Sequence, residues 1–212
     1  MDENKLVSVV TATYNMGHYV REAVDSVLAQ TYPHIEAVVV DDGSEDDTPE
    51  ILAAYADDPR VTVIRQDNAG QTVAKNRGLA ACRGRWVGFC DADNAWLPDK
   101  IATQLPPLEA ENPPGVVYGD LQFMDGEGHD IPTPAVPRFS GRITGKLLTD
   151  NFVPFNTCLV PRAVIEEVGG FDESLSMAID YDLWLRISTR YDFLHIPRVM
   201  ARYRHWEGQM SH

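Results

Sequence analysis

The chain has 212 residues, 44% of them apolar, which is enough for one large α/β domain with a substantial core. A formal net charge of −14 argues against nucleic acid as a partner, because 18 Lys and Arg residues cannot form a broad basic face. No apolar run approaches the ~20 residues that span a bilayer, and the start of the chain lacks the features of a secretory signal. We therefore expect no membrane span and a location in the cytoplasm, either free or peripheral at the inner face of the membrane.

Predicted strands and helices alternate along the first half of the chain. Apolar, β-rich runs predict strands, and apolar residues at helical spacing predict the helices between them. Strands are expected at 6–13, 35–40, 61–65 and 85–90, and helices at 19–30, 48–55, 72–82 and from near Pro98. This βαβαβαβ order with short connections predicts an α/β fold with a mostly parallel central sheet flanked by helices.

The second half is less regular. Strands are expected at 116–119, 157–160, 193–196 and 199–203, and helices at 163–168 and 181–189. Residues 125–141, rich in Gly and Pro, are predicted to form a long loop. A loop of this length in a compact domain is more often a functional lid than a simple connection.

Polar residues follow three of the predicted strands, at 13–15, 41–42 and 91–93. Ligands of open parallel sheets bind at the carboxyl ends of the strands, so these clusters are expected to converge on one edge. The first strand is not followed by G-x-G-x-x-G, and the sequence contains no G-K-[ST] phosphate loop. The absence of these motifs argues against a dinucleotide dehydrogenase and against a P-loop enzyme.

Asp91 and Asp93 come directly after a predicted apolar strand. Two carboxylates at such a place supply hard oxygen ligands for Mg²⁺ or Mn²⁺, cations that share their remaining coordination sites with substrate phosphates. Without further information, an Asp-x-Asp triplet would be interpreted as a solvent-exposed turn and not as a metal site. Its position at the end of a strand is what favours a metal site.

Four further residues are candidates for nucleotide contacts. Asp42 can accept a hydrogen bond from a uracil-like base, and the ring of Tyr14 offers a stacking surface. Lys75 and Arg77, on the predicted helix 72–82, are placed to contact phosphate or base. Without the other residues, Asp42 would be interpreted as a turn or cap residue, and Tyr14 as a half-buried aromatic side chain. Lys75 and Arg77 would fit a solvent-exposed helix face almost as well as a ligand site.

Asp180 lies at the predicted start of a helix. It fits two roles, an N-cap of that helix or a general base that removes a proton from a substrate hydroxyl. The second role suits a carboxylate partly shielded from water, because desolvation raises its pKa towards the working range.

Six segments in this order resemble the family 2 inverting glycosyltransferases of the A-type fold, over essentially the whole chain. They are V-S-V-V-T-A-T-Y-N at 7–15, V-V-V-D-D-G-S-E-D-D-T at 38–48, N-A-G-Q-T-V-A-K-N-R-G at 68–78, F-C-D-A-D at 89–93, G-G-F-D-E at 169–173 and D-Y-D-L-W-L-R at 180–186. Each segment is a weak signal, and their shared order and spacing make the resemblance specific.

The resemblance implies a single Rossmann-like domain over residues 1–212, with a nucleotide-sugar-binding half (1–110) and an acceptor-binding and catalytic-base half (111–212). It implies that a Mn²⁺ or Mg²⁺ ion assists inverting transfer of a sugar from a nucleotide-diphosphate sugar, with UDP favoured, to a glycan, lipid-linked or small-molecule acceptor. The residues it assigns are Asp180 as general base, Asp93 and His205 as metal ligands, and Thr11, Tyr14, Asp42, Lys75, Arg77 and Asp91 in the nucleotide-sugar site. Considered alone, His205 would be an exposed loop imidazole.

The sequence departs from the family pattern at two positions and lacks one motif. Lys75 stands where the family usually has Arg, and the two are not equivalent for bidentate contacts. Ile179 stands where many members have Glu before the base. No Q-x-x-R-W motif is present, so a processive polysaccharide synthase is not expected.

Two alternatives remain open at this point. One is a sugar-nucleotide-binding module without useful catalysis, a reading that Ile179 keeps open. The other is a sugar nucleotidyltransferase. That enzyme would need a Gly-rich loop with a basic residue after the first strand, which residues 16–18 do not supply.

Overall fold

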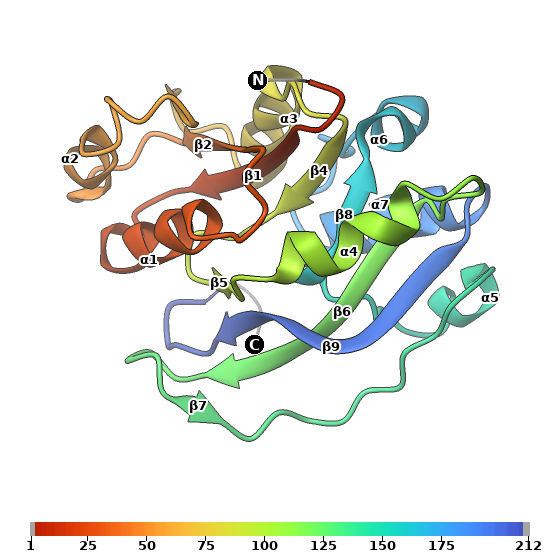
Figure 1. Ribbon diagram of the computed structural model, residues 1–212. Helices are drawn as coiled ribbons and strands as arrows, with labels where there is room; N and C mark the ends of the chain where they lie inside the picture. The colour runs from red at the N-terminus through yellow and green to blue at the C-terminus, as the bar shows by residue number, and fades with distance from the viewer. Residues whose placement is uncertain (1–2, 210–212) are drawn as a thin grey trace.

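The computed structural model describes residues 3–209, which form a mixed β-sheet covered by helices on both faces (Figure 1). Its strands are β1 (Val7–Thr13), β2 (Ile35–Asp41), β3 (Val61–Arg65), β4 (Trp86–Phe89), β5 (Ala95–Trp96), β6 (Val116–Met124), β7 (Asp130–Ile131), β8 (Leu159–Pro161) and β9 (Phe193–Arg204). Its helices are α1 (Gly17–Leu28), α2 (Thr48–Ala53), α3 (Gln71–Ala81), α4 (Lys100–Leu108), α5 (Thr144–Leu147), α6 (Arg162–Val168) and α7 (Ile179–Ser188), with a 3-10 turn η1 (Phe155–Thr157). The α/β fold predicted from the sequence is confirmed.

The N-terminal half forms the parallel part of the sheet, as predicted. β1 pairs in parallel with both β2 and β4, and β2 pairs in parallel with β3. Every residue of β2 and nearly every residue of β1 is buried, which explains their continuous apolar sequence. The register places Thr13 beside Asp41, so β1 and β2 end at the same edge of the sheet.

The C-terminal half makes the sheet mixed. β8 runs antiparallel to both β4 and β6, and β9 runs parallel to β6. The strand order is β3-β2-β1-β4-β8-β6-β9-β5, with β7 paired to the outer end of β6. Because β8 reverses the direction, β6 again runs in the sense of β4, and the carboxyl ends of both strands lie at the edge where β1 and β2 end.

The predicted division of residues 193–203 into two strands is wrong, since β9 is continuous. Pro197 lies between the two predicted strands, and a proline cannot donate a ladder hydrogen bond. In the structure the β6–β9 register shifts at this point, from Tyr118 opposite His195 to Asp120 opposite Val199. Pro197 therefore lies in an irregularity where the ladder does not need its missing N–H.

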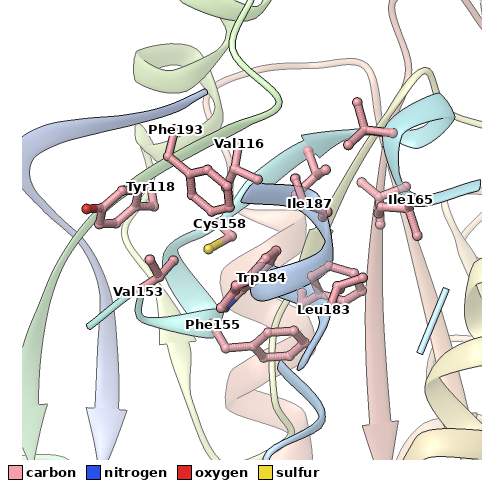
Figure 2. Close-up of a cluster of buried hydrophobic side chains, with 14 of the residues drawn as sticks. Val116, Tyr118, Val153, Phe155, Cys158, Ile165, Leu183, Trp184, Ile187 and Phe193 are labelled. Carbon is pink, nitrogen blue, oxygen red and sulfur yellow. The ribbon is translucent and has the colours of Figure 1, made fainter. Parts of the chain in front are cut away.

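Two apolar clusters hold the helices on opposite faces of the sheet. α1 and α4 pack on one face, and α3, α6 and α7 on the other (Figure 1). The second cluster contains Trp184 of α7, Phe193 of β9 and Phe155 of η1 (Figure 2). Phe155 also stacks on Phe89 at the end of β4, with ring centroids 4.6 Å apart. This packing fixes α7 and η1 against the strand that leads into Asp91.

No helix within residues 3–209 is long and apolar enough to cross a membrane.

A buried lysine lies between α4 and β8. The Lys100 Nζ donates to Gln104 Oε1 at 2.7 Å and to the carbonyl of Cys158 at 3.2 Å, and it lies 3.8 Å from the centre of the Trp96 ring. None of these partners is a carboxylate, so the ammonium form loses its hydration without gaining a counter-charge. Burial accordingly lowers the pKa of Lys100 to about 7.

The Lys100 environment predicts a pH-dependent stability. An unfolded lysine titrates near ~10.4, so between pH 7 and that value the unfolded chain binds more protons than the folded one. The contribution of Lys100 to the free energy of unfolding therefore rises with pH in this window, by up to ~1.4 kcal/mol per pH unit. We expect the Lys100→Met variant to lack this rise.

The measurement is urea unfolding of wild type and Lys100→Met from about pH 6 to about pH 9. The difference between the two proteins isolates Lys100, because both share every other titrating group. A difference that stays constant across this range would contradict the prediction.

Candidate active site

Asp91 follows β4 and is held by residues from two distant parts of the chain. Its carboxylate lies 3.1 Å from Lys75 Nζ on α3 and accepts a hydrogen bond of 2.7 Å from Asn156 Nδ2 on η1. Its backbone N–H donates to Asn156 Oδ1, also at 2.7 Å. The Lys75 ammonium lies over the ring of Phe155 at 4.6 Å. The negative charge of Asp91 is therefore compensated within the protein, and its position is fixed on both sides.

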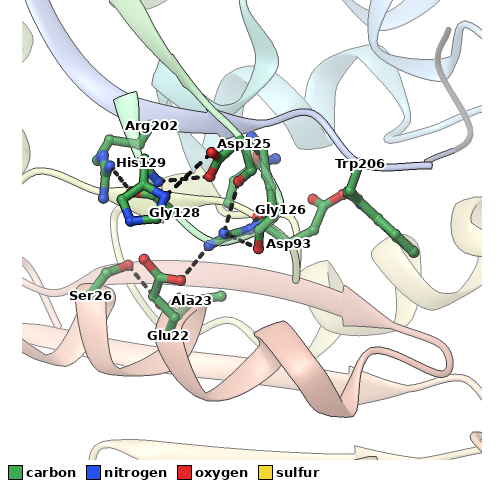
Figure 3. A network of polar contacts seen from close by, with 12 residues as sticks. Glu22, Ala23, Ser26, Asp93, Asp125, Gly126, Gly128, His129, Arg202 and Trp206 are labelled. Atoms are coloured by element: carbon green, nitrogen blue, oxygen red, sulfur yellow. Dashed lines mark hydrogen bonds and ion pairs between the residues drawn. The ribbon is translucent and has the colours of Figure 1, made fainter. Parts of the chain in front are cut away.

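Asp93 lies two residues further on in a different environment (Figure 3). Its carboxylate accepts a hydrogen bond from Trp206 Nε1 at 3.0 Å, and Arg204 donates only to its backbone carbonyl, at 2.9 Å. Among residues 3–209 no Lys or Arg side chain forms an ion pair with this carboxylate. Burial, and after it the charge of nearby Asp91, raises the pKa of Asp93. A raised carboxyl pKa reflects negative charge that the surroundings do not neutralise.

A divalent cation would neutralise that charge, so the chemistry of Asp93 fits a metal ligand. Mg²⁺ and similar ions take one or two carboxylates and fill their other positions with water and substrate phosphate. No group of three or more His, Cys, Asp or Glu suited to a metal occurs in the described part of the chain. Asp93 would thus hold such an ion together with phosphate oxygens rather than within a closed protein cage.

The structure does not place His205 on Asp93. The His205 ring packs against Phe123 and Tyr203, with centroids 4.4 Å and 5.3 Å away, and its backbone N–H donates to Met124 at the end of β6. The neighbouring Trp206 makes the contact with Asp93 instead. A metal-ligand role for His205 stays a prediction.

Asp42 shapes the loop that leads into α3. Its two oxygens accept hydrogen bonds from Gln66 Nε2 at 2.7 Å and from the backbone N–H groups of Ala69 at 2.9 Å and Gly70 at 2.8 Å. The exposed Arg77 donates to Gln66 at 3.3 Å and so extends this network to the surface of α3. A carboxylate has about four acceptor positions, so one remains for a ligand.

The remaining residues of the predicted nucleotide site lie along β1. Tyr14 follows the strand and is 44% exposed, so its ring is accessible for stacking. Thr11 is buried within β1 opposite Val39 of β2. Thr11 therefore lies beneath the open surface at this edge of the sheet.

Asp180 lies inside the first turn of α7. The N-cap is Ala178, in the left-handed conformation with φ 53°, and it makes no side-chain cap hydrogen bond. The N-cap alternative for Asp180 is therefore wrong, because the helix has begun before it. Within residues 3–209, its carboxylate accepts one side-chain hydrogen bond, from Asn151 Nδ2 at 3.1 Å. The side chain is only partly exposed, and Ile179 before it is buried in the apolar core.

The start of α7 is tied to the start of α3. Gln71 and Thr72, the first residues of α3, donate to the backbone carbonyls of Ser176 and Leu175 at 3.0 Å and 2.8 Å. Gly70, bonded to Asp42, directly precedes them. The segment carrying Asp180 is therefore docked on the same helix end that Asp42 positions and from which Lys75 reaches Asp91.

One further carboxylate lies in the same row of the sheet. Leu159 of β8 is opposite Gly88 of β4 and Val117 of β6. Asp91 and Asp120 each follow these residues by three positions on strands of the same direction, so they lie at corresponding positions along β4 and β6. The Asp120 carboxylate is 3.0 Å from His195 Nε2 and 3.6 Å from Arg138 Nε, and it is 37% exposed. The sequence contained no local signal for this residue, for Asn156 or for Trp206, because their hydrogen-bond partners His195, Asp91 and Asp93 are 75, 65 and 113 residues away.

Residues 8–169 match the family model described as "Glycosyl transferase family 2". The chain belongs to this family. An uncharacterised glycosyltransferase of Rickettsia prowazekii is 34% identical over 205 residues, covering 93% of this chain and 64% of the relative. The chondroitin synthase of Escherichia coli is 33% identical over 199 residues, covering 92% and 28%. The chain therefore spans less than two thirds of the curated relatives it matches.

Solved structures show the same A-type glycosyltransferase fold. Staphylococcus aureus TarS 1–349 in complex with UDP-GlcNAc superposes with a TM-score of 0.76 at 21% identity, covering 96% of this chain and 59% of TarS. The mannosyltransferase PcManGT of Pyrobaculum calidifontis, in complex with GDP-Man and Mn²⁺, gives a TM-score of 0.71 at 23% identity, covering 93% and 56%. The chain is thus a glycosyltransferase domain of family 2.

The paired hydrogen bonds between Asn156 and Asp91 predict a large loss of stability on their removal. In the Asn156→Ala variant of this family 2 domain, the Asp91 N–H and carboxylate both lose a buried partner. We expect the free energy of unfolding to fall by about 1–3 kcal/mol.

Asn151→Ala is the matched control. It also removes a hydrogen bond from an amide to a carboxylate, that of Asp180, but Asn151 is exposed. Its expected loss is below about 0.5 kcal/mol. Urea unfolding at neutral pH measures both, and equal losses would show that the Asn156 contact is not a buried link.

Proposed function

We propose that this chain catalyses transfer of a sugar from a nucleotide-diphosphate sugar to an acceptor hydroxyl, with inversion and with help from Mn²⁺ or Mg²⁺. The observation that carries this proposal is that neither of two carboxylates, Asp93 and Asp180, forms an ion pair with a basic side chain among residues 3–209. Asp93, without a basic partner, suits the leaving-group side, and Asp180 on α7, with only an amide partner, suits the nucleophile side. A direct displacement needs one such group on each side of the reacting carbon.

Residues 1–110 bind the donor in this proposal. The base stacks on Tyr14 and uses the remaining acceptor position of Asp42, above the floor formed by Thr11. Asp91 accepts a hydrogen bond from the ribose, held in place by Lys75. Arg77 lies on the exposed face of α3, where it meets the outer part of the nucleotide.

The diphosphate lies at Asp93. A divalent cation held there by Asp93, and by His205 if that segment rearranges, would stabilise the negative charge of the departing diphosphate. The Mn²⁺ in the complex of PcManGT with GDP-Man supports this assignment. We favour UDP over other nucleotides because the complex of TarS, which shares the fold of this chain, contains UDP-GlcNAc. The unused acceptor position of Asp42 suits the imide N–H of uracil, but it suits that of thymine equally.

Residues 111–212 bind the acceptor. Asp180 takes the proton of the acceptor hydroxyl as its oxygen forms a bond to the anomeric carbon, and the bond from that carbon to the diphosphate breaks on the opposite face. The proton ends on Asp180 and the bonding electrons on the diphosphate. Asp120, with His195 and Arg138, lies in the same row of the sheet and offers further polar contacts to a glycan, a lipid-linked sugar or a small-molecule acceptor.

The donor site predicts metal-dependent nucleotide binding. We expect wild type to bind UDP more tightly with Mn²⁺ than without it, and more tightly than GDP or dTDP. The Asp93→Ala variant should lose the effect of Mn²⁺ and keep the metal-free affinity, because only the ion contacts Asp93. Calorimetric titration of the three nucleotides, with and without Mn²⁺, provides the measurement.

Asp130→Ala serves as the control in these titrations, since it removes an exposed carboxylate that pairs with Arg202 and does not contact Asp93. Full metal dependence in Asp93→Ala would refute the metal assignment. Absence of binding of any nucleotide to wild type would refute the glycosyltransferase activity of this domain as a whole.

The base assignment predicts that Asp180→Asn loses roughly 10²–10⁴-fold in the rate of transfer. The amide keeps the shape and the contact with Asn151 but cannot accept a proton. UDP affinity should not change. The rate is measured as UDP released from whichever UDP-sugar the wild type consumes, and inversion is measured by NMR of the product.

Asp182→Asn is the comparison variant, because Asp182 is committed to an ion pair of 2.6 Å with Arg186 one turn further along α7. Wild-type turnover by Asp180→Asn would rule out its role as base. Release of pyrophosphate instead of UDP would identify a nucleotidyltransferase, and tight UDP-sugar binding without turnover would identify a binding module.

A further inference from the structure

Trp206 covers the candidate metal ligand. Its indole N–H donates to Asp93 Oδ2 at 3.0 Å (Figure 3). The ring is held edge-on against Tyr19 of α1, with centroids 5.2 Å apart. It also packs against Gly208, where an added Cβ would lie 2.2 Å from the ring in its present position. The indole is thus specifically packed on Asp93 and is not a surface side chain that happens to touch it.

Arg204, two residues before Trp206, is firmly anchored. The Arg204 guanidinium is buried and donates to the backbone carbonyls of Asp93, Asp125 and Gly126 and to the carboxylate of Glu22. These partners come from the Asp93 loop, the turn after β6 and helix α1. Arg204 therefore fixes the end of β9 beside Asp93, whatever Trp206 does.

The chain after Arg204 leaves the sheet. The β6–β9 ladder ends at Met124 and Arg204, and the backbone N–H of His205 makes one more bond, to Met124, at 2.8 Å. Residues 206–209 then form a turn in which Gln209 N–H donates to the Trp206 carbonyl at 3.2 Å. The Gln209 side chain contacts the hydroxyl of Tyr203. This turn lies beyond the β6–β9 ladder, so displacing it would break no strand pairing among residues 3–209.

The chemistry of an indole makes it a competitor of a cation at this carboxylate. Indole N–H is a donor only and cannot ligate a metal. It directs its positive end at the same oxygen lone pairs that a divalent cation uses. The ring also fills the space beside Oδ2. Binding of a cation to this oxygen is therefore unfavourable while the indole occupies its present position.

We propose that Trp206 is a removable cap on Asp93 that lowers the affinity of this site for a divalent cation, and that joint binding of the cation and a nucleoside diphosphate displaces it. This inference rests on the proposed metal-binding role of Asp93. The cap disfavours occupation by the cation alone and makes loading depend on the diphosphate, whose oxygens supply further ligands. Trp206 is in this sense a positioning residue that sets metal affinity.

The test is titration of Mn²⁺ and of Mg²⁺ into wild type and Trp206→Phe, with UDP present and without it. Phenylalanine keeps an aromatic ring next to Tyr19, removes the N–H donor and leaves a smaller side chain beside Asp93. A hydrogen bond to a charged acceptor is worth enough for about a tenfold change in affinity. We expect Trp206→Phe to bind both cations about tenfold more tightly, with the larger gain in the absence of UDP, and to bind UDP unchanged without metal.

A second readout follows the indole directly. Trp86, Trp96 and Trp184 are buried, so the difference in fluorescence between wild type and Trp206→Phe reports on the partly exposed Trp206. Adding UDP with Mg²⁺, which does not quench by paramagnetism, should shift this difference emission to the red as the indole leaves Asp93. Trp184→Phe is the control, because its Nε1 has no hydrogen-bond partner. It should leave cation affinity unchanged.

The outcomes separate the cap from the proposed function. Tighter cation binding by Trp206→Phe together with the red shift supports the cap. Equal or weaker binding by Trp206→Phe, or an unshifted emission, overturns the cap while metal-dependent UDP binding by wild type still supports the glycosyltransferase site. Absence of metal-dependent binding in both proteins overturns the metal assignment of Asp93 and the cap with it.

Discussion

The reciprocal hydrogen bonds between Asp91 and Asn156 are the contact on which the site depends. Asp91 ends the parallel part of the sheet, and Asn156 begins the antiparallel part, so these two bonds join the halves of the domain at the edge where the candidate residues lie. Phe155, beside Asn156, packs both on Phe89 and under the Lys75 ammonium. The position of β8, and through it of β6 and β9, relative to β4 is therefore fixed by the same residues that hold Asp91.

The distribution of charge around the two aspartates gives them different properties although only one residue separates them. Lys75 compensates Asp91, whereas Asp93 meets an indole N–H and the backbone-directed Arg204. Lys75 stands where family 2 usually has arginine. A single ammonium between Asp91 and the Phe155 ring needs no bidentate fork, so the substitution suits this environment. Asp93, which has no basic partner among residues 3–209, is therefore the carboxylate at which we propose a divalent cation.

The fold common to family 2 members leaves specificity to local differences. TarS and PcManGT share the fold of this chain at 21% and 23% identity, and their complexes contain UDP-GlcNAc and GDP-Man. Discrimination between such donors thus depends on side chains at the strand ends and not on the arrangement of strands. In this domain the segment after β9 contributes Trp206 to Asp93, so the proposed acceptor half also contacts the proposed donor site.

The sequence by itself determined the alternation of strands and helices in residues 6–90, because buried parallel strands require continuous apolar runs and the helices between them require amphipathic spacing. It also placed Tyr14, Asp42 and the 91–93 carboxylates at strand ends, and its ordered motifs indicated the family. It did not determine the continuity of β9 through Pro197, the short α5 and β5, or the partners of Asp91 and Asp93. Those features were decided only by tertiary structure, because register and side-chain pairing between residues 65 to 113 positions apart leave no trace in local periodicity.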